Sequence, residues 1–179
     1  MLFQPGREWE AINGEFTKAP AIFLGYVIPV SAVTPVAYLL GAVLFGEQGT
    51  LFGTVETTLG TAVQDAVAHY VLGLAGVFAL GVALELLAPS FSGQGNRVQG
   101  LKVAAYASTP AWVMGALNVI PRLAPFALLG VLWTLYLVFA GSPSLMKIPE
   151  EKATPFGAVA AVAAAVVAVV FEVLARAFA

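Results

Sequence analysis

The sequence predicts an all-α polytopic membrane protein, a bundle of five transmembrane helices preceded by a short interfacial helix. Three observations lead to this fold class: the apolar composition, five apolar runs, and the uneven placement of basic residues between them. Hydrophobic residues make up 60% of the 179 residues and charged residues only 10%, whereas a soluble domain is about 45–50% apolar and about 25% charged. Most of the apolar surface is therefore expected to face lipid.

The first element is an amphipathic segment at residues 1–19, set apart from a membrane domain at residues 20–179. It carries one apolar stripe at helical spacing, made by Leu2, Trp9, Ile12 and Phe16. Tryptophan is typical of the lipid headgroup zone. Two roles are open for this helix, a simple membrane anchor or a docking helix for a partner.

Five apolar runs follow, each close to the length that crosses a bilayer as a helix, about 18–20 residues. They cover residues 20–45, 66–84, 103–120, 123–140 and 155–171. The gaps between them are short, so we expect neighbouring helices to pack antiparallel in one bundle.

Basic residues gather in alternate gaps. Those before the first run, after the second and after the fourth hold Arg7, Lys18, Arg97, Lys102, Lys147 and Lys152. The remaining gaps hold only Arg122 and Arg176, and the Gly/Thr-rich connector at 46–60 has none. Because basic loops stay on the cytoplasmic side, this pattern predicts a cytoplasmic N-terminus and a periplasmic or extracellular C-terminus.

Prolines and hydroxyls are the polar features inside the runs. Pro29 and Pro35 flank Ser31 and Thr34 in the first run, and Pro110 interrupts the third. A proline inside a membrane helix frees backbone groups that hydroxyls, water or neighbouring helices must satisfy. We therefore predict a kink in the first run, with a cavity lining as the alternative reading. Other hydroxyls near span centres are Ser108, Thr109 and Thr134.

Asp65 and His69 are the most suggestive pair for chemistry. They lie four residues apart at the outer end of the second run, so they share one helix face. Such a pair could relay a proton, but two ligands are too few for a metal site. The expected role is a hydrogen-bonded pair at the interface, with a functional site as the alternative.

Two further charged pairs are predicted as ion pairs at the ends of helices. Glu85 and Lys102 flank the turn between the second and third runs at matching depth. Glu172 and Arg176 lie four apart near the end of the fifth run. Neither pair is expected at mid-membrane, where a proton-driven carrier usually holds an ionisable group.

Several classes of function are disfavoured. The chain has no cysteine, which excludes disulfides and thiol catalysis, and a net charge of −2, which argues against a nucleic-acid partner. It has no nucleophile motif, phosphate loop or HExxH zinc helix. We therefore expect no enzyme activity, no metal and no cofactor; the expected partners are the lipid bilayer and either a membrane-protein partner or further copies of the chain.

Four segments together resemble a known family. They are QPGREWEAINGEF, YVIP, LLAPSFSGQGNRVQGLKVAAYASTPAWV and YLVFAGSPSLMKIPEEKA. Along essentially its whole length the chain resembles the bacterial branch of the YIP (Ypt/Rab-interacting protein) family. The resemblance implies five spans, a cytoplasmic N-terminus and, for a bacterial member, the inner membrane. Eukaryotic members bind Rab-type GTPases, but their tyrosine-glycine-proline-type motif is absent here, so no GTPase-binding residue is assigned.

Three functions follow as hypotheses. The first is a non-enzymatic scaffold or adaptor that uses the internal loops at 90–100 and 141–154. The second is a small-solute or ion channel or carrier, and the third is a lipid-binding protein. Both of the latter would use a groove between the kinked first and third runs, with polar positions at Ser31, Thr34, Tyr106, Ser108, Thr109 and Pro110.

Overall fold

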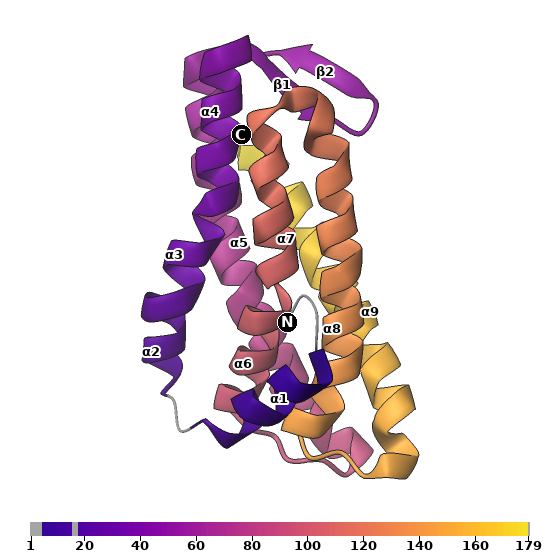
Figure 1. Cartoon of the computed structure of the whole chain (residues 1–179). Coiled ribbons are helices and arrows are strands. Elements are labelled where there is room, and N and C mark those ends of the chain that lie inside the picture. The colour runs from indigo at the N-terminus through magenta and orange to yellow at the C-terminus, as the bar shows by residue number, and fades with distance from the viewer. Residues whose placement is uncertain (1–4, 16–17, 179) are drawn as a thin grey trace.

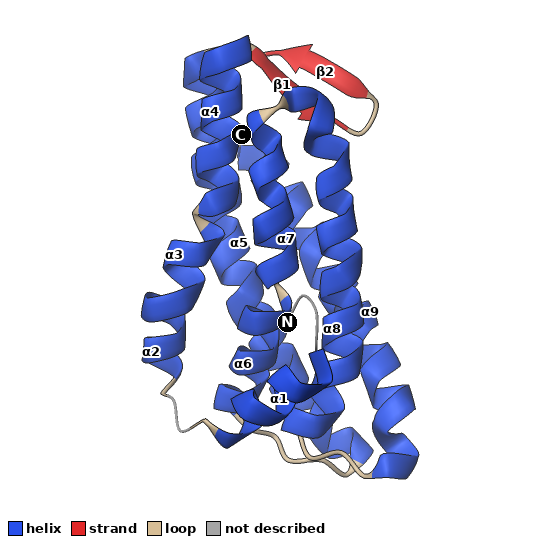
Figure 2. Cartoon of the chain, in the orientation of Figure 1, coloured by secondary structure: helices blue, strands red, loops and turns tan. Residues whose placement is uncertain are grey.

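The computed structural model describes residues 5–15 and 18–178. Long helices run side by side along one axis, with a β-hairpin at one end and helix α1 at the other (Figures 1 and 2). We call these the hairpin end and the α1 end. The C-terminal helix finishes at the hairpin end (Figure 1).

The first predicted span is helical but bent, as the prolines predicted. It consists of α2 (Ala19–Ile22), a π-helical turn (Phe23–Val27), α3 (Ile28–Ser31) and α4 (Val33–Phe45). The helix is interrupted at Ala32, and α3 lies offset from the axis of α4 (Figure 1). Pro29 and Pro35 lack the amide hydrogens that a straight helix uses, and π-turns accompany such bends.

The Gly/Thr-rich connector after α4 forms an antiparallel hairpin, which the sequence analysis did not predict. Strand β1 (Glu47–Thr50) pairs with β2 (Gly53–Glu56), with Glu47 opposite Glu56. Gly53 has φ +141, a conformation that favours glycine, at the end of the turn. Gly49 lies so close to the backbone of Pro121 that a side chain there would clash. Strand β1 therefore packs tightly on the turn that begins at Pro121.

Three further helices are long and apolar. Helix α5 (Leu59–Leu87) is capped by Thr58, whose hydroxyl accepts a hydrogen bond from the Thr61 amide. It continues into the 3₁₀ turn Ala88–Phe91. Helix α8 (Ala127–Leu145) follows the 3₁₀ turn Pro121–Phe126, and α9 (Glu150–Phe178) ends the chain. Together with the bent first span, they are the four helices of the described chain that are long and apolar enough to cross a membrane.

The third predicted span, residues 103–120, is interrupted close to Pro110, as the sequence predicted. The chain there forms α6 (Arg97–Ala107), α7 (Thr109–Met114) and a 3₁₀ turn (Gly115–Val119). The break lies at Ser108, two residues before Pro110, and the Ser108 and Thr109 hydroxyls donate to the carbonyls of Ala104 and Tyr106. These pieces run from the α1 end to the hairpin end (Figure 1), but the predicted count of five spanning helices is not confirmed.

The α1 end of the bundle is closely packed. Gly81 of α5 faces Gly100 of α6, and a Cβ on Gly100 would overlap the Gly81 carbonyl oxygen. Val27, Ala105 and Phe156 are fully buried. Small residues let membrane helices approach in this way. The half of the bundle nearest α1 is therefore closely packed.

Helix α1 (Pro5–Gly14) lies across this end of the bundle (Figure 1). Of the predicted apolar stripe, Trp9 and Ile12 are buried, while Leu2 and Phe16 lie outside the described residues. The Trp9 ring lies on Gly141 of α8, where any larger residue would overlap it. The helix therefore docks on the bundle; its place in the membrane interface stays a prediction.

The predicted Glu85–Lys102 ion pair is wrong. Glu85 instead pairs with Arg97, at 2.8 Å between Oε2 and Nε. Lys102 is only 1% exposed, and its Nζ donates to the carbonyl oxygens of Ile12 at 2.7 Å and Glu15 at 2.6 Å. The prediction failed because α6 begins at Arg97, which turns Lys102 inward beneath α1. Burial lowers the pKa of Lys102, since it disfavours the charged form.

Replacing Lys102 by methionine is expected to loosen α1. The change removes two charge-assisted hydrogen bonds from the end of α1 but also relieves the cost of burying an ammonium, which leaves a net loss of about 1–3 kcal/mol. Hydrogen–deuterium exchange of residues 5–15 should become faster. Arg97→Gln is the matched control, because an exposed pair contributes only about 0–1 kcal/mol. Unchanged exchange in Lys102→Met would show that the lysine does not hold α1.

Candidate functional site

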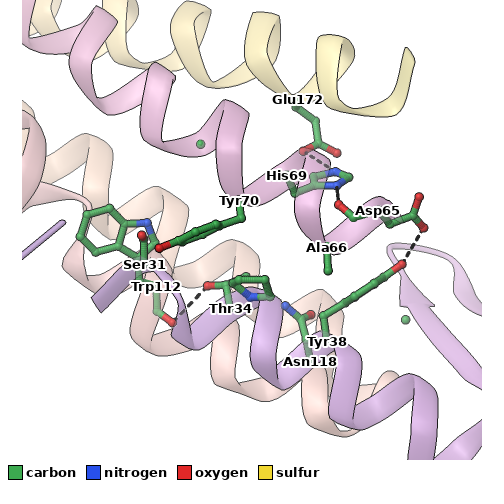
Figure 3. A pocket seen from close by; sticks show the side chains of 13 residues that line it. Ser31, Thr34, Tyr38, Asp65, Ala66, His69, Tyr70, Trp112, Asn118 and Glu172 are labelled. Carbon is green, nitrogen blue, oxygen red and sulfur yellow. Dashed lines mark hydrogen bonds and ion pairs between the residues drawn. The ribbon is translucent and has the colours of Figure 1, made fainter. Parts of the chain in front are cut away.

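A cavity of about 410 Å³ lies toward the hairpin end, between the bent first span, α5, α7 and α9 (Figure 3). We call it the polar chamber. The side chains with polar groups that line it are Ser31, Thr34, Tyr38, Asp65, His69, Tyr70, Trp112, Asn118 and Glu172. A volume of this size falls within the range of roughly 300–1,000 Å³ found for small-molecule sites.

The bent first span supplies one wall. Ser31, Thr34 and Tyr38 follow at three and four residues, so they face the same side of the helix. The Thr34 hydroxyl lies 3.4 Å from the carbonyl oxygen of Trp112. Gly115 permits this contact, because a Cβ there would overlap the Thr34 side chain. The first span and the third segment therefore meet as predicted, but with Thr34 as the point of contact.

Helix α5 supplies the opposite wall through Asp65, His69 and Gly73, which succeed one another at intervals of four residues. Gly73 is the middle residue of α5 (Leu59–Leu87). No atom lies within 4 Å of a Cβ built on it. The cavity therefore reaches from the hairpin end to about half the length of the bundle.

The predicted hydrogen-bonded pair of Asp65 and His69 forms through the backbone oxygen of Asp65, and no hydrogen bond joins the two side chains in the described structure. The Asp65 carboxylate turns toward the hairpin, where its Oδ2 accepts from the Tyr38 hydroxyl at 2.8 Å and from Gln48 Nε2 at 3.1 Å. The His69 Nδ1 lies 2.8 Å from the backbone oxygen of Asp65. A histidine four residues on reaches this carbonyl more easily than the side chain that points away from it (Figure 3).

The other ring nitrogen of His69 faces Glu172 of α9. The distance from Nε2 to Glu172 Oε2 is 3.4 Å, and Glu172 Oε1 accepts from Arg176 Nε at 2.8 Å. The predicted Glu172–Arg176 pair is thus confirmed, and His69 joins it from α5. The sequence held a signal for this contact, since both residues stand near the outer ends of their predicted spans.

Aromatic side chains close the part of the chamber that lies away from the hairpin end. Tyr70 donates its hydroxyl to the carbonyl oxygen of Ile28 at 2.9 Å, and Ser31 Oγ lies 3.3 Å from the same oxygen. Trp112 lies beside them, away from the hairpin (Figure 3). The chamber thus has its carboxylates toward the hairpin end, and the rings of Tyr70 and Trp112 toward the α1 end.

A second cavity of about 210 Å³ adjoins the first, between α5, α7, α8 and α9. We call it the apolar chamber, because its walls are mainly aliphatic and aromatic, among them Val77, Leu80, Val131, Leu135, Val167 and Phe171. It shares His69, Gly73, Trp112 and Glu172 with the polar chamber. Thr134 also lines it, and within the described chain its buried hydroxyl has no hydrogen-bond partner.

The candidate residues from the sequence separate into two groups. Ser31, Thr34, Asp65, His69 and Glu172 line the polar chamber, and Ser108 lines the apolar chamber.

Tyr106, Thr109 and Pro110 belong to neither chamber lining. The Tyr26 hydroxyl lies 2.7 Å from Thr109 Oγ1, and the Tyr26 and Tyr106 rings are 4.7 Å apart. Pro110 is buried, with its carbonyl against Gly130. The half of the predicted groove that lies nearest the α1 end, between the first and third spans, is thus closed.

Five lining or supporting residues were missed by sequence reasoning: Tyr38, Gln48, Tyr70, Trp112 and Asn118. Tyr38 is three and seven residues beyond Pro35 and Ser31, so helical spacing alone could have added it to the Ser31–Thr34 face. Gln48 enters through the hairpin, which was not predicted. In the described part of the chain, no group of three His, Asp or Glu side chains is placed to hold a metal ion.

Comparison with known proteins gives one family and two relatives. The pattern that describes the Yip1 domain matches residues 1–171. The inner membrane protein YohC of Escherichia coli K12 is 26% identical over 162 residues, which cover 87% of this chain and 82% of YohC. YohC of E. coli O6:H1 matches to the same extent. No solved structure gave a significant match.

Proposed function

The chain belongs to the Yip1 domain family, and from that premise we propose that it is a non-enzymatic protein of the bacterial inner membrane that binds a small amphipathic molecule. The observation that carries the proposal is the pair of adjoining chambers, one polar and one apolar, with His69, Gly73, Trp112 and Glu172 common to both. The inner-membrane location is carried over from the name of the E. coli relative.

The two chambers suit a ligand with a polar head and a short apolar tail. Hydroxyl, amide, imidazole and carboxylate groups face the first chamber, whereas Val77, Leu80 and Phe171 face the second. Binding sites for small molecules combine an apolar lining with a few placed polar groups in this way. A purely polar solute would leave the apolar chamber empty, and a purely apolar one would leave the polar groups unpaired.

Access is from the hairpin end. A further cavity lies between the hairpin and α9 and shares Tyr38, Asp65, His69 and Glu172 with the polar chamber. It extends to Phe52, whose side chain is 99% exposed at the tip of the hairpin. The packed α1 end lies on the other side, so a one-sided binding site is favoured over a continuous pore.

The orientation of the protein in the membrane remains part of the proposal. Arg97 and Lys102 of α6 lie at the α1 end, whereas Arg122 and Arg176 lie toward the hairpin end, as expected from the gap pattern. With basic residues on the cytoplasmic side, the chambers open to the periplasm. A periplasm-only reporter enzyme should then be active when fused after Ala179 and silent when fused after Lys152. The reverse pattern would contradict this orientation.

Binding can be measured through Trp112, which lines both chambers. A variant with Trp9→Phe and Trp133→Phe keeps Trp112 as the one tryptophan, since the chain has three. In nanodiscs of phosphatidylcholine, at least one probe from the set hexylammonium, hexanol and hexanoate should change its fluorescence saturably. Absence of a saturable change with all three would refute the proposal.

A second candidate function is the scaffold or adaptor predicted from the internal loops. Helices occupy much of the predicted loops at 90–100 and 141–154 and leave only residues 92–96 and 146–149 outside them. The role is favoured by contact between the two segments: the Gln94 amide donates to the Met146 carbonyl at 2.8 Å, and Lys152 Nζ at the start of α9 donates to Ser92 Oγ at 2.8 Å. In this role, these segments and α1, which lies at the same end of the bundle (Figure 1), contact a membrane-protein partner or another copy of the chain. Crosslinking in native membranes tests this role. Crosslinks from these segments to lipid, with none to protein, would contradict it.

A further inference from the structure

We propose that the ligand carries a cationic ammonium head, held in the polar chamber against Asp65, and a short alkyl tail in the apolar chamber. This inference rests on the proposed binding function and names the chemical class of its ligand. The charge and the aromatic rings of the polar chamber and the apolar lining of the second chamber are the observations that carry it.

The charge of the polar chamber favours a cation. Two carboxylates, Asp65 and Glu172, line it together with His69, and no Lys or Arg is among its described lining residues. The lining residues themselves therefore carry more negative than positive charge. Arg176 lies outside this lining and pairs with Glu172, so Asp65 carries the negative charge that is left.

Asp65 is the carboxylate left to receive the ligand. Glu172 already faces basic groups with both of its oxygens, His69 through Oε2 and Arg176 through Oε1. Among the described residues, the Asp65 carboxylate accepts from Tyr38 and Gln48 alone, which are neutral, and both hydrogen bonds go to Oδ2. Within the described residues, no basic side chain forms an ion pair with it. Ionisable groups inside a membrane segment are costly and usually have a partner, and an ammonium would be that partner.

Three aromatic side chains strengthen the choice. Tyr38, Tyr70 and Trp112 line the same chamber, on the side away from α9 (Figure 3). An ammonium over an aromatic face is attracted by the ring, most of all with tryptophan, whereas an anion is repelled by that face. Neutral and anionic heads would therefore bind less well than an ammonium of the same size.

The apolar chamber sets the tail, because its lining is mainly aliphatic and aromatic. Val77, Leu80 and Phe171 accept alkyl carbons, and the chamber adjoins the polar chamber at His69, Gly73 and Trp112. A ligand with its head on Asp65 therefore places an apolar chain there.

The test compares three probes of equal chain length, hexylammonium, hexanol and hexanoate, on the Trp112-only protein in phosphatidylcholine nanodiscs. Hexylammonium should bind more tightly than the other two. In Asp65→Asn, which keeps the size of the side chain, its affinity should fall roughly tenfold to a hundredfold, the loss of one charge-assisted interaction. The affinity for hexanol should change little. Glu10→Gln, which removes an exposed negative charge on α1, is the control and should change neither.

The outcomes separate this inference from the function on which it rests. If hexanol or hexanoate binds as well as hexylammonium, the chambers bind amphipathic molecules but the cationic head is refuted. If hexylammonium binds equally well to Asp65→Asn and to the parent, Asp65 does not recognise it and the inference is overturned. If no probe binds, the proposed function itself fails. Circular dichroism of Asp65→Asn distinguishes lost affinity from lost fold.

Discussion

Replacing Gly73 by leucine is expected to abolish binding of hexylammonium while the bundle stays folded. Gly73 lines both chambers, at the point where they adjoin. No atom lies within 4 Å of a Cβ built there, so the new side chain would enter open space rather than clash. Leucine would occupy that space and separate the two chambers. Titration of Trp112 fluorescence should show an affinity at least a hundredfold lower than that of the parent, since the ligand could no longer fit.

The matched control is Gly25→Leu. Gly25 is also an exposed glycine of a spanning helix with open space at its Cβ, but it lines neither chamber. It should bind the probe as the parent does. Equal binding by Gly73→Leu and Gly25→Leu would place the ligand elsewhere on the molecule.

Replacing Trp9 by alanine is expected to have the largest effect on structure. The ring is 3% exposed and lies on Gly141. Removing a buried tryptophan costs about 3–5 kcal/mol. Because α1 lies across one end of the bundle, we expect this loss to release α1 rather than unfold the spanning helices. Hydrogen–deuterium exchange of residues 5–15 should approach that of a free peptide.

Trp133→Ala provides the comparison, because the Trp133 side chain is 39% exposed on α8 and has less contact to lose. It should leave exchange of α1 unchanged. Continued slow exchange in Trp9→Ala would mean that α1 is held by other contacts, Lys102 first among them. Cooperative loss of the whole bundle would show instead that α1 is required for the fold.

What the sequence predicted correctly was set locally. The long apolar runs follow from the thickness of a bilayer, and the bend follows from Pro29 and Pro35, which lack amide hydrogens. The Glu172–Arg176 pair spans one helical turn. In these cases a few neighbouring residues determine the structure, and spacing alone is sufficient.

The errors arose where distant segments meet. Lys102 was paired with Glu85 by depth, but the carbonyl oxygens of Ile12 and Glu15, far away in sequence, were closer acceptors. Helical spacing placed His69 within hydrogen-bonding reach of Asp65, but it could not show that the Asp65 carboxylate accepts from Tyr38 and Gln48. The hairpin that carries Gln48 has strands of only four residues, too short for a clear alternation of apolar residues. The periodicity of a single segment gives no information about contacts between segments that are far apart in the sequence.

The chambers themselves arise from these long-range contacts. The bend of the first span directs Thr34 toward Trp112, and Gly115 lets the two segments approach. Composition could identify Ser31, Thr34, Asp65 and His69 as polar residues in apolar surroundings, but not that Glu172 of α9 joins them. A cavity of this kind depends on how four segments pack, which requires the structure.

Photolabelling tests most directly whether the ligand sits in the two chambers. Hexylammonium with a diazirine on its terminal carbon would be bound in nanodiscs, irradiated, and its attachment sites mapped by mass spectrometry. We predict labels on the chamber face of α5 and its neighbours, at Gly73, Val77 and Leu135, and their suppression by unlabelled hexylammonium. Labels confined to the exposed face of α5, at Val67, Val71 and Phe78, and unaffected by competitor would show that the probe only dissolves in the surrounding lipid.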